Sequence, residues 1–251
     1  MAGGKKVPTT SSSSTPASSS AASSSAAASS AEVDAFLRKV AQAPSIHKPG
    51  ERGRLIFAMD ATASREPTWD RASHLQAEMF KETAALGGLE IQLVYYRGFG
   101  ECKASPWVAN ANDLLKRMTG VFCLAGHTQI VKVLKHALAE TKKKKVGALV
   151  FVGDCIEEDV DKLGHLAGEL GLLGMPCFMF HEGMDPIARM AFQQIARLSG
   201  GAYCPFDTAS AKQLRDLLSA VAVYAAGGRK ALADYGERKG GVVKQLTHQV
   251  K

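Results

Sequence analysis

The stretch Arg54-Leu55-Ile56-Phe57-Ala58-Met59-Asp60-Ala61-Thr62-Ala63-Ser64 joins an apolar run to a short polar motif. Its apolar residues are continuous from position 55 to 59, which is typical of a strand buried on both faces of a parallel sheet. Because Asp60, Thr62 and Ser64 follow that strand directly, we expect them at the carboxyl edge of the sheet. Ligands of open α/β sheets bind at this edge.

Predicted strands and helices alternate along the rest of the chain. Further strands are expected at 89–96, 146–152, 175–180 and 202–205, with a short antiparallel strand within 102–108. Helices are expected at 33–42, after Thr68, at 110–118, from Thr128, and at 157–172, 187–198 and 210–226. This order predicts a three-layer αβα sandwich around a mostly parallel, doubly wound, Rossmann-like sheet with one short antiparallel edge strand.

Composition divides the chain into three parts. Residues 1–32 are rich in Ser and Ala and predict a disordered tail, since they have too few apolar side chains to offset the entropy of ordering. Residues 33–226 form the predicted α/β domain, and 227–251 form a basic C-terminal extension. Of the net charge of +7, the tail contributes +1 and the extension +4, which leaves +2 for the domain. No aromatic residues are interleaved with a basic face, so nucleic-acid binding through the extension is the less favoured interpretation.

Cysteine usage and hydropathy bear on the compartment. The five cysteines include no Cys-x-x-Cys pair, so neither a disulfide framework nor a zinc site is suggested. No apolar run has the length of a membrane span, and the N-terminus lacks the apolar region of a secretory signal. The sequence therefore predicts a cytoplasmic protein that does not contact a membrane.

Two further oxygen side chains are expected at the same edge of the sheet. Thr128 is placed at the start of a predicted helix, and Asp154 follows the 146–152 strand. Together with Asp60, Thr62 and Ser64 they offer two carboxylates and three hydroxyls, which are the hard ligands that Mg²⁺ or Mn²⁺ prefers. Such a set leaves a coordination position for an incoming carboxylate. Asp, Ser and Thr are also common after strands because they cap helices, so the first motif alone is a weak signal.

Taken together, these motifs resemble the metal-ion-dependent adhesion site (MIDAS) of the von Willebrand factor type A (vWA) domain. The resemblance rests on Asp60-x-Thr62-x-Ser64, Gly126-His127-Thr128 and Gly153-Asp154, and it covers roughly residues 53–223. The run from Asp60 to Asp70 is similar to a bacterial subgroup of such proteins.

The resemblance implies a Mg²⁺ ion held directly by the hydroxyls, with the aspartates acting largely through water. It also implies a protein partner whose Glu or Asp supplies the last ligand, and vWA proteins often serve in assemblies with AAA+ ATPases. This chain departs from the family pattern at Thr62, where Ser is usual, and at Gly153-Asp154-Cys155, where Asp-Gly is the more usual ending.

The leading hypothesis is therefore a metal-dependent protein-binding module with no catalytic residues. The alternative is a Mg²⁺-dependent hydrolase or phosphoryl-transfer enzyme in which Asp60 is the nucleophile or the metal activates water. The sequence contains no phosphate loop, dinucleotide fingerprint or Gly-x-Ser-x-Gly elbow. Among other residues, we expect His127 in an exposed loop, His136 and His165 on helix surfaces, and Trp69 and Trp107 in packing.

Overall fold

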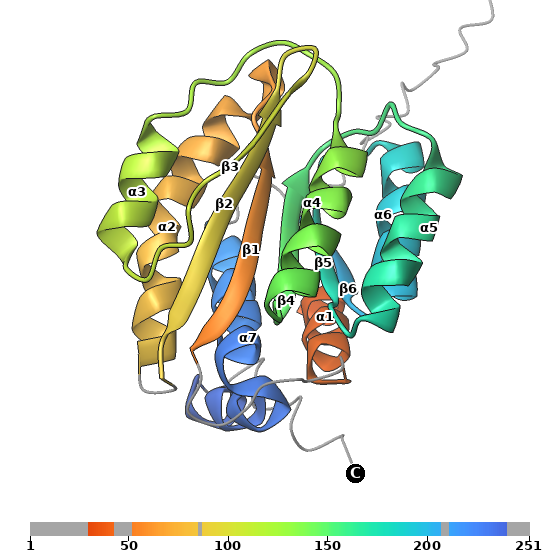
Figure 1. Cartoon of the computed structure of the whole chain (residues 1–251). Coiled ribbons are helices and arrows are strands. Elements are labelled where there is room, and N and C mark those ends of the chain that lie inside the picture. The colour runs from red at the N-terminus through yellow and green to blue at the C-terminus, as the bar shows by residue number, and fades with distance from the viewer. Residues whose placement is uncertain (1–29, 43–51, 85–86, 207–210, 240–251) are drawn as a thin grey trace, which may run out of the picture.

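A six-stranded sheet runs through the computed structural model, which describes residues 30–42, 52–84, 87–206 and 211–239 (Figure 1). The strands lie in the order β3-β2-β1-β4-β5-β6. Their bounds are Gly53–Asp60 for β1, Leu89–Arg97 for β2, Glu101–Ala104 for β3, Ala148–Gly153 for β4, Cys177–Glu182 for β5 and Ala202–Phe206 for β6. All neighbouring strands are parallel except β2 and β3. The predicted sheet, with its single antiparallel edge strand, is confirmed.

The first strand lies at the centre because both of its faces are apolar. Every residue of β1 is buried, and it pairs with β2 on one side and β4 on the other. Asp60 aligns with Tyr96 of β2, and Met59 aligns with Val152 of β4. The chain thus moves outward from β1 to β2 and β3 and then returns to β4 on the opposite side. The carboxyl ends of β1 and β4 form the switch point at which ligands of doubly wound sheets bind.

Helices cover both faces of the sheet (Figure 1). Residues Leu55, Phe57 and Met59 face a core with α1, α2, α3 and α7, whereas Ile56 and Ala58 face a second core with α4, α5 and α6. This division follows from the twofold alternation of side chains along a strand. The helix bounds are Ser30–Gln42 for α1, Glu66–Thr83 for α2, Ala111–Thr119 for α3, Ile130–Lys143 for α4, Val160–Leu172 for α5, Pro186–Ser199 for α6 and Ala211–Lys239 for α7.

Several predicted helix starts differ from the structure by two or three residues; α1, for example, starts at Ser30 rather than at position 33. Thr128 does not begin a helix, because α4 starts at Ile130, and α5 starts at Val160 rather than Glu157. Asp159 caps α5 by accepting hydrogen bonds from the first turn. The carboxylate of Glu158 instead accepts from the backbone nitrogens of Ile130 and Val131 at the start of α4. Asp159 therefore stabilises the N-terminus of α5, as predicted, whereas Glu158 stabilises that of the neighbouring helix α4.

The antiparallel strand and the last helix also differ in extent from the prediction. β3 ends at Ala104, and Val108 then forms an isolated bridge with Ile91. Pro106 lies between them and has no N–H group to continue the ladder. α7 continues through a kink at Gly228, where φ is 69°, as far as Lys239.

Two helices, α1 and α7, run across the predicted domain limits at 32/33 and 226/227. Most of the predicted tail, residues 1–29, lies outside the described residues, and α1 begins at Ser30. The described part of the predicted extension, residues 227–239, is helical, with Leu232 and Tyr235 buried.

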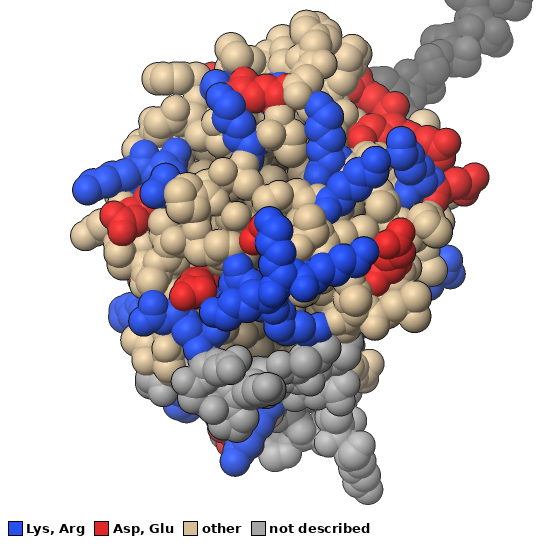
Figure 2. Space-filling model, viewed as in Figure 1, with Lys and Arg blue, Asp and Glu red and all other residues tan. Residues whose placement is uncertain are grey.

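Charge is unevenly distributed on the face shown in Figure 2. Basic side chains gather over the lower end of α4, where Lys142 and Lys143 occupy the last turn and Lys144 is the C-cap. This confirms that the lysine run closes a helix, where cations suit the carbonyl end of the dipole.

Within the described residues, no helix is both long enough and apolar enough to cross a membrane.

Candidate metal centre

Asp60 ends β1 as a buried carboxylate at the switch point. The residue is 1% exposed, and its Oδ1 accepts a hydrogen bond of 2.7 Å from the backbone nitrogen of Thr62. Its Oδ2 is buried and has no hydrogen-bond partner. Burial raises the pKa of Asp60, because desolvation disfavours the charged form. A buried carboxylate oxygen without a partner is unfavourable unless a cation or a proton occupies the space that it faces.

Asp154 lies opposite, directly after β4. Its Oδ2 accepts a 2.8 Å hydrogen bond from the Ser64 hydroxyl, and its Oδ1 is buried without a hydrogen-bond partner. The hydroxyl oxygens of Thr62 and Ser64 lie 3.4 Å apart. The structure therefore joins four of the five predicted ligand residues, Asp60, Thr62, Ser64 and Asp154, through this chain of contacts.

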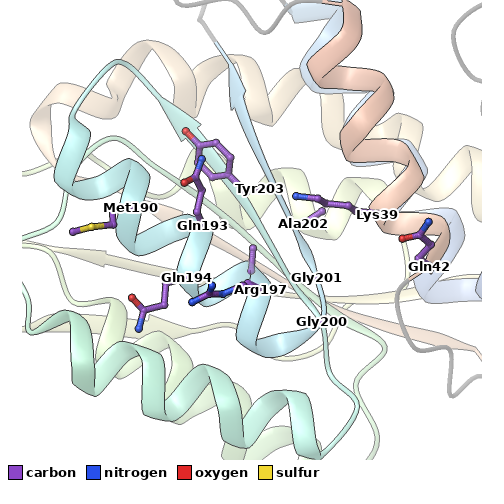
Figure 3. A pocket seen from close by; sticks show the side chains of 11 residues that line it. Lys39, Gln42, Met190, Gln193, Gln194, Arg197, Gly200, Gly201, Ala202 and Tyr203 are labelled. Carbon is purple, nitrogen blue, oxygen red and sulfur yellow. The ribbon is translucent and has the colours of Figure 1, made fainter.

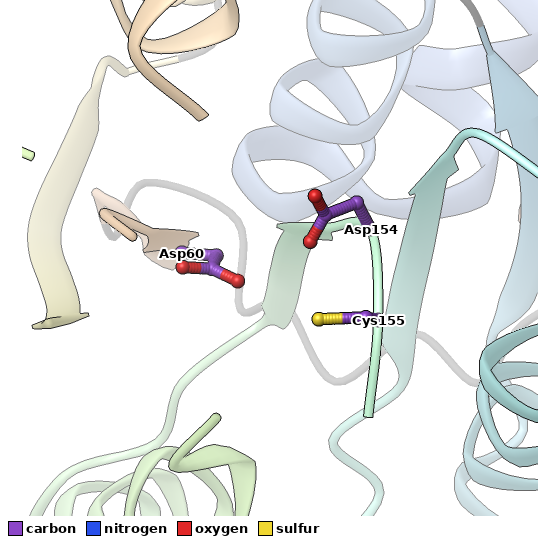
Figure 4. Close-up of side chains that lie close together, drawn as sticks. All are labelled: Asp60, Asp154 and Cys155. Atoms are coloured by element: carbon purple, nitrogen blue, oxygen red, sulfur yellow. The ribbon is translucent and has the colours of Figure 1, made fainter. Parts of the chain in front are cut away.

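One ligand atom from each of Asp60, Asp154 and Cys155 lies within 4.8 Å of the others. In Figure 4 the two carboxylates and the thiol extend from neighbouring segments toward a common space. Cys155 is intermediate in exposure, and burial raises the pKa of its thiol to about 12, with the negative charge of Asp154 adding to the effect. In the sequence, Cys155 marks only a departure from the family pattern, and no role is predicted for it.

Thr128, the fifth predicted ligand residue, connects two loops at the same edge. Its hydroxyl accepts a 3.0 Å hydrogen bond from the backbone nitrogen of Glu157, and its own backbone nitrogen donates to Glu157 Oε2 at 3.0 Å. It is buried, and it makes no hydrogen bond to the other four predicted residues in the described structure. The structure thus ties Thr128 to the loop that follows Asp154 rather than directly to the Asp60 motif.

A buried ion pair that the sequence did not predict lies beside the site. Arg65 is 2% exposed and pairs with Glu182 at the end of β5, and its Nη1 lies 3.6 Å from Asp154 Oδ2. The Thr68 hydroxyl also donates to Glu182. Arg65 directly follows the Asp-x-Thr-x-Ser motif, which was a usable signal, whereas Glu182 is 117 residues away along the chain and only the fold brings it near.

A tyrosine and a histidine pack behind the two carboxylates. Tyr96 is fully buried, and its pKa is raised by burial and then by the charge of Asp60. The Nε2 of His181 lies 3.2 Å from the Asp154 carbonyl oxygen, and its Nδ1 lies 3.0 Å from the Tyr203 hydroxyl. Both ring nitrogens of His181 are therefore engaged, and burial lowers its pKa.

The remaining residues considered from sequence lie as expected, except His136. His127 is exposed and its Nδ1 lies 2.9 Å from Glu157. Trp69 is 3% exposed, and Trp107 packs under the Arg54 guanidinium at 3.7 Å from the ring centroid. His165 is exposed on α5, whereas His136 on α4 is half-buried.

A cavity of about 600 Å³ lies elsewhere, between α1, α6 and β6 (Figure 3). Its lining includes Lys39, Gln193, Arg197 and Tyr203, together with Gly200-Gly201. These glycines precede β6, so the cavity is at the amino end of the parallel strands, opposite the edge that holds Asp60 and Asp154. No carboxylate is among its described lining residues, and it is not the metal centre.

The donors at the switch point fit a divalent cation. The two unpartnered oxygens, Asp60 Oδ2 and Asp154 Oδ1, supply negative charge, and the hydroxyls of Thr62 and Ser64 supply neutral oxygens. Fold and site together define a class of protein: a doubly wound αβα sandwich with carboxylates and hydroxyls gathered where β1 and β4 end.

Comparisons with solved structures identify the fold more closely. Proximal thread matrix protein 1 (PTMP1) from the mussel byssus matches with a TM-score of 0.55 and 12% identity, over 70% of this chain and 48% of that one. A second PTMP1 structure, with a zinc-occupied MIDAS motif, matches with a TM-score of 0.53 and 13% identity, over 70% of this chain and 47% of that one. The SpRpn10 VWA domain matches with a TM-score of 0.50 and 13% identity, over 71% of this chain and 98% of that one.

The chain has the vWA fold. It spans about half the length of the mussel protein and nearly all of the Rpn10 domain. No protein-family model matches the chain, and no curated protein matches it in sequence.

Proposed function

We propose that the chain is a metal-dependent protein-binding module whose cation is held by Asp60, Thr62, Ser64, Thr128 and Asp154. The observation that carries the proposal is the pair of buried, unpartnered carboxylate oxygens at Asp60 and Asp154. A cation between them would give both oxygens the partner that they lack. The PTMP1 structure with a zinc-occupied MIDAS motif supports the proposal, because it shows that a protein of similar fold binds a divalent cation.

Oxygen donors alone favour Mg²⁺ or Mn²⁺ at this centre. Asp60 and Asp154 would bind it directly or through water, and Ser64, which is exposed, lies on the solvent side. Thr128 would enter the shell through water or after a movement of its loop, since its hydroxyl now accepts from Glu157. A solvent-facing position would accept a Glu or Asp carboxylate from a protein partner.

Exposed apolar side chains on neighbouring loops support a protein partner. Phe99, Phe122 and Leu124 are 83%, 73% and 49% exposed. The Leu124 nitrogen donates to the Ala61 carbonyl at 3.0 Å, which places Leu124 beside the Asp60 loop. The Phe99 ring lies 5.2 Å from the ring of His127. Apolar groups gathered at one edge are typical of an interaction surface, so we expect the partner's acid to be flanked by apolar residues.

The alternative, a Mg²⁺-dependent hydrolase or phosphoryl-transfer enzyme, has no specific observation in its favour. His181 is the histidine in contact with Asp154, and its two ring nitrogens face Tyr203 and a backbone carbonyl. Membership of an assembly with an AAA+ ATPase remains an implication of the family resemblance alone.

Calorimetric titration with Mg²⁺, Mn²⁺ and Zn²⁺ tests the metal site. Asp60→Ala should abolish binding of all three, whereas Asp70→Ala, an exposed acid on α2, should leave it unchanged. Circular dichroism would verify that both variants are folded. A wild-type chain that binds none of these cations would contradict the proposal.

Selection of displayed peptides tests the partner chemistry. Peptides retained in the presence of the cation and released by EDTA should be enriched in Asp or Glu beside apolar residues. Replacing that acid by Asn or Gln should abolish capture, as should Asp60→Ala in the protein. Capture that is equal with cation and with EDTA would overturn the proposed mode of binding.

A further inference from the structure

We propose that the Cys155 thiolate is a ligand of this cation and makes the centre select Zn²⁺ over Mg²⁺. The inference rests on the proposed metal site and deepens it, because it names the kind of cation that the site prefers. Oxygen donors alone do not imply this preference, and the cysteine spacing of the sequence gives no indication of it.

The geometry places sulfur among the two carboxylates. Ligand atoms of Asp60, Asp154 and Cys155 lie within 4.8 Å of one another and face the same space (Figure 4). Ligands of a single zinc ion lie roughly 3–4 Å apart, since each is about 2.0–2.3 Å from the metal. Small side-chain movements would bring these three atoms to such a separation. Asp60, which is 1% exposed and has one oxygen without a hydrogen-bond partner, extends its carboxylate toward this group (Figure 4).

Packing does not account for Cys155 as it does for the other cysteines. Cys177 and Cys204 belong to the two apolar cores, and Cys102 and Cys123 pack against them. Cys155 alone of the five belongs to neither core and makes no packing contact with them. Its sulfur lies beside the Asp60 and Asp154 carboxylates instead.

The chemistry of sulfur then decides the cation. Thiolate is a soft ligand that binds Zn²⁺ and Co²⁺ well, whereas Mg²⁺ prefers oxygen. On binding, the Cys155 S–H bond breaks, a sulfur–metal bond forms, and the proton is released to solvent. With two carboxylates, one thiolate and the Thr62 or Ser64 oxygen, the chain supplies the four donors of a zinc site.

Cobalt absorption tests whether sulfur is a ligand. Co²⁺ added to the full chain should give a sulfur-to-metal charge-transfer band in the near ultraviolet, and one equivalent of Zn²⁺ should remove it. The band should be lost in Cys155→Ser and kept in Cys123→Ser, a control for a half-buried thiol that packs against the core. Titrations should show that Cys155→Ser lowers Zn²⁺ affinity at least about tenfold and changes Mg²⁺ affinity by less than about threefold.

The outcomes separate this inference from the proposed function. Co²⁺ that binds the wild-type chain without a charge-transfer band, or with a band that persists in Cys155→Ser, would overturn sulfur ligation while leaving the metal site in place. Absence of binding by any cation would remove both. Alkylation of wild-type Cys155, followed by mass spectrometry, gives a readout that needs no variant. Zn²⁺ should protect this thiol and Mg²⁺ should not, and equal modification with either cation would contradict the proposal.

Discussion

The Ser64 hydroxyl donates a 2.8 Å hydrogen bond to the Asp154 carboxylate, although the two residues are 90 positions apart in the chain. This contact joins the loop after β1 to the loop after β4. It holds one carboxylate oxygen of Asp154 and leaves the other, Oδ1, without a hydrogen-bond partner. Ser64 therefore orients a charge that the proposed cation would need.

Ser64→Ala should weaken cation binding roughly 10–100-fold, the range found when a group that orients a metal ligand is removed. Ser64 is exposed, so the free energy of unfolding should change by no more than about 0.5 kcal/mol. Calorimetric titration and urea unfolding measure the two effects. Cation affinity equal to that of the wild type would show that the Ser64–Asp154 contact plays no part in the site.

Arg65→Gln should destabilise the protein by about 3 kcal/mol, because it leaves Glu182 as a largely buried carboxylate without its cation. Arg65 is 3% and Glu182 15% exposed at the side chain, so solvent can compensate only part of the loss. Urea unfolding of the metal-free protein measures the change. Arg197→Gln, an exposed arginine on α6, is the matched control and should have little effect.

The double variant Arg65→Gln/Glu182→Gln distinguishes loss of the ion pair from loss of side-chain packing. Removing both charges should restore much of the stability that Arg65→Gln loses, since no unpaired buried carboxylate remains. If the double variant is instead less stable than Arg65→Gln by as much as an independent second substitution would cost, then Arg65 and Glu182 are not coupled.

Gly126→Ala should destabilise the fold by about 1–3 kcal/mol through steric overlap. A Cβ at this position would lie 2.0 Å from the Gly98 carbonyl oxygen, which belongs to the turn between β2 and β3. The loop that carries Thr128 would have to move, so cation affinity should fall as well. Gly168→Ala on α5, where the added Cβ meets open space, should instead stabilise the protein by roughly 0.5–1 kcal/mol. Thermal unfolding of both variants, with cation titration of Gly126→Ala, measures these effects.

Histidine burial should make the fold less stable in mild acid. Burial lowers the pKa of His136 below its usual 6.5. The negative charge of Glu140 opposes this shift, and the positive charge of Lys143 adds to it. The Nε2 of His136 lies 2.8 Å from Gln92 Oε1. Below pH 6.5 the unfolded chain then binds more protons than the folded one. The free energy of unfolding should therefore fall as the pH is lowered through this range and be regained above it.

Urea unfolding at several values between about pH 8 and pH 5 measures this slope. His136→Gln should reduce the slope without abolishing it, because His181 is also buried with a lowered pKa. An identical slope in His136→Gln and the wild type would show that His136 does not couple to folding.

The sequence by itself determined the class of fold and most of the proposed ligands. Continuous apolar strands such as β1 can be buried only in a sheet covered on both faces, and the alternation with helices requires parallel crossovers. Polar residues directly after two such strands must then lie at one edge. That reasoning located Asp60, Thr62, Ser64 and Asp154, because it depends on local periodicity and strand direction alone.

Tertiary structure decided the contacts between segments that are distant in the chain. Nothing local indicates that Glu158 caps α4, that Thr128 bonds to Glu157, or that Arg65 is paired with Glu182. The position of the Cys155 sulfur beside two carboxylates is likewise set by how the end of β4 lies against the end of β1. Side-chain direction and burial depend on packing between elements, and a linear pattern does not encode them.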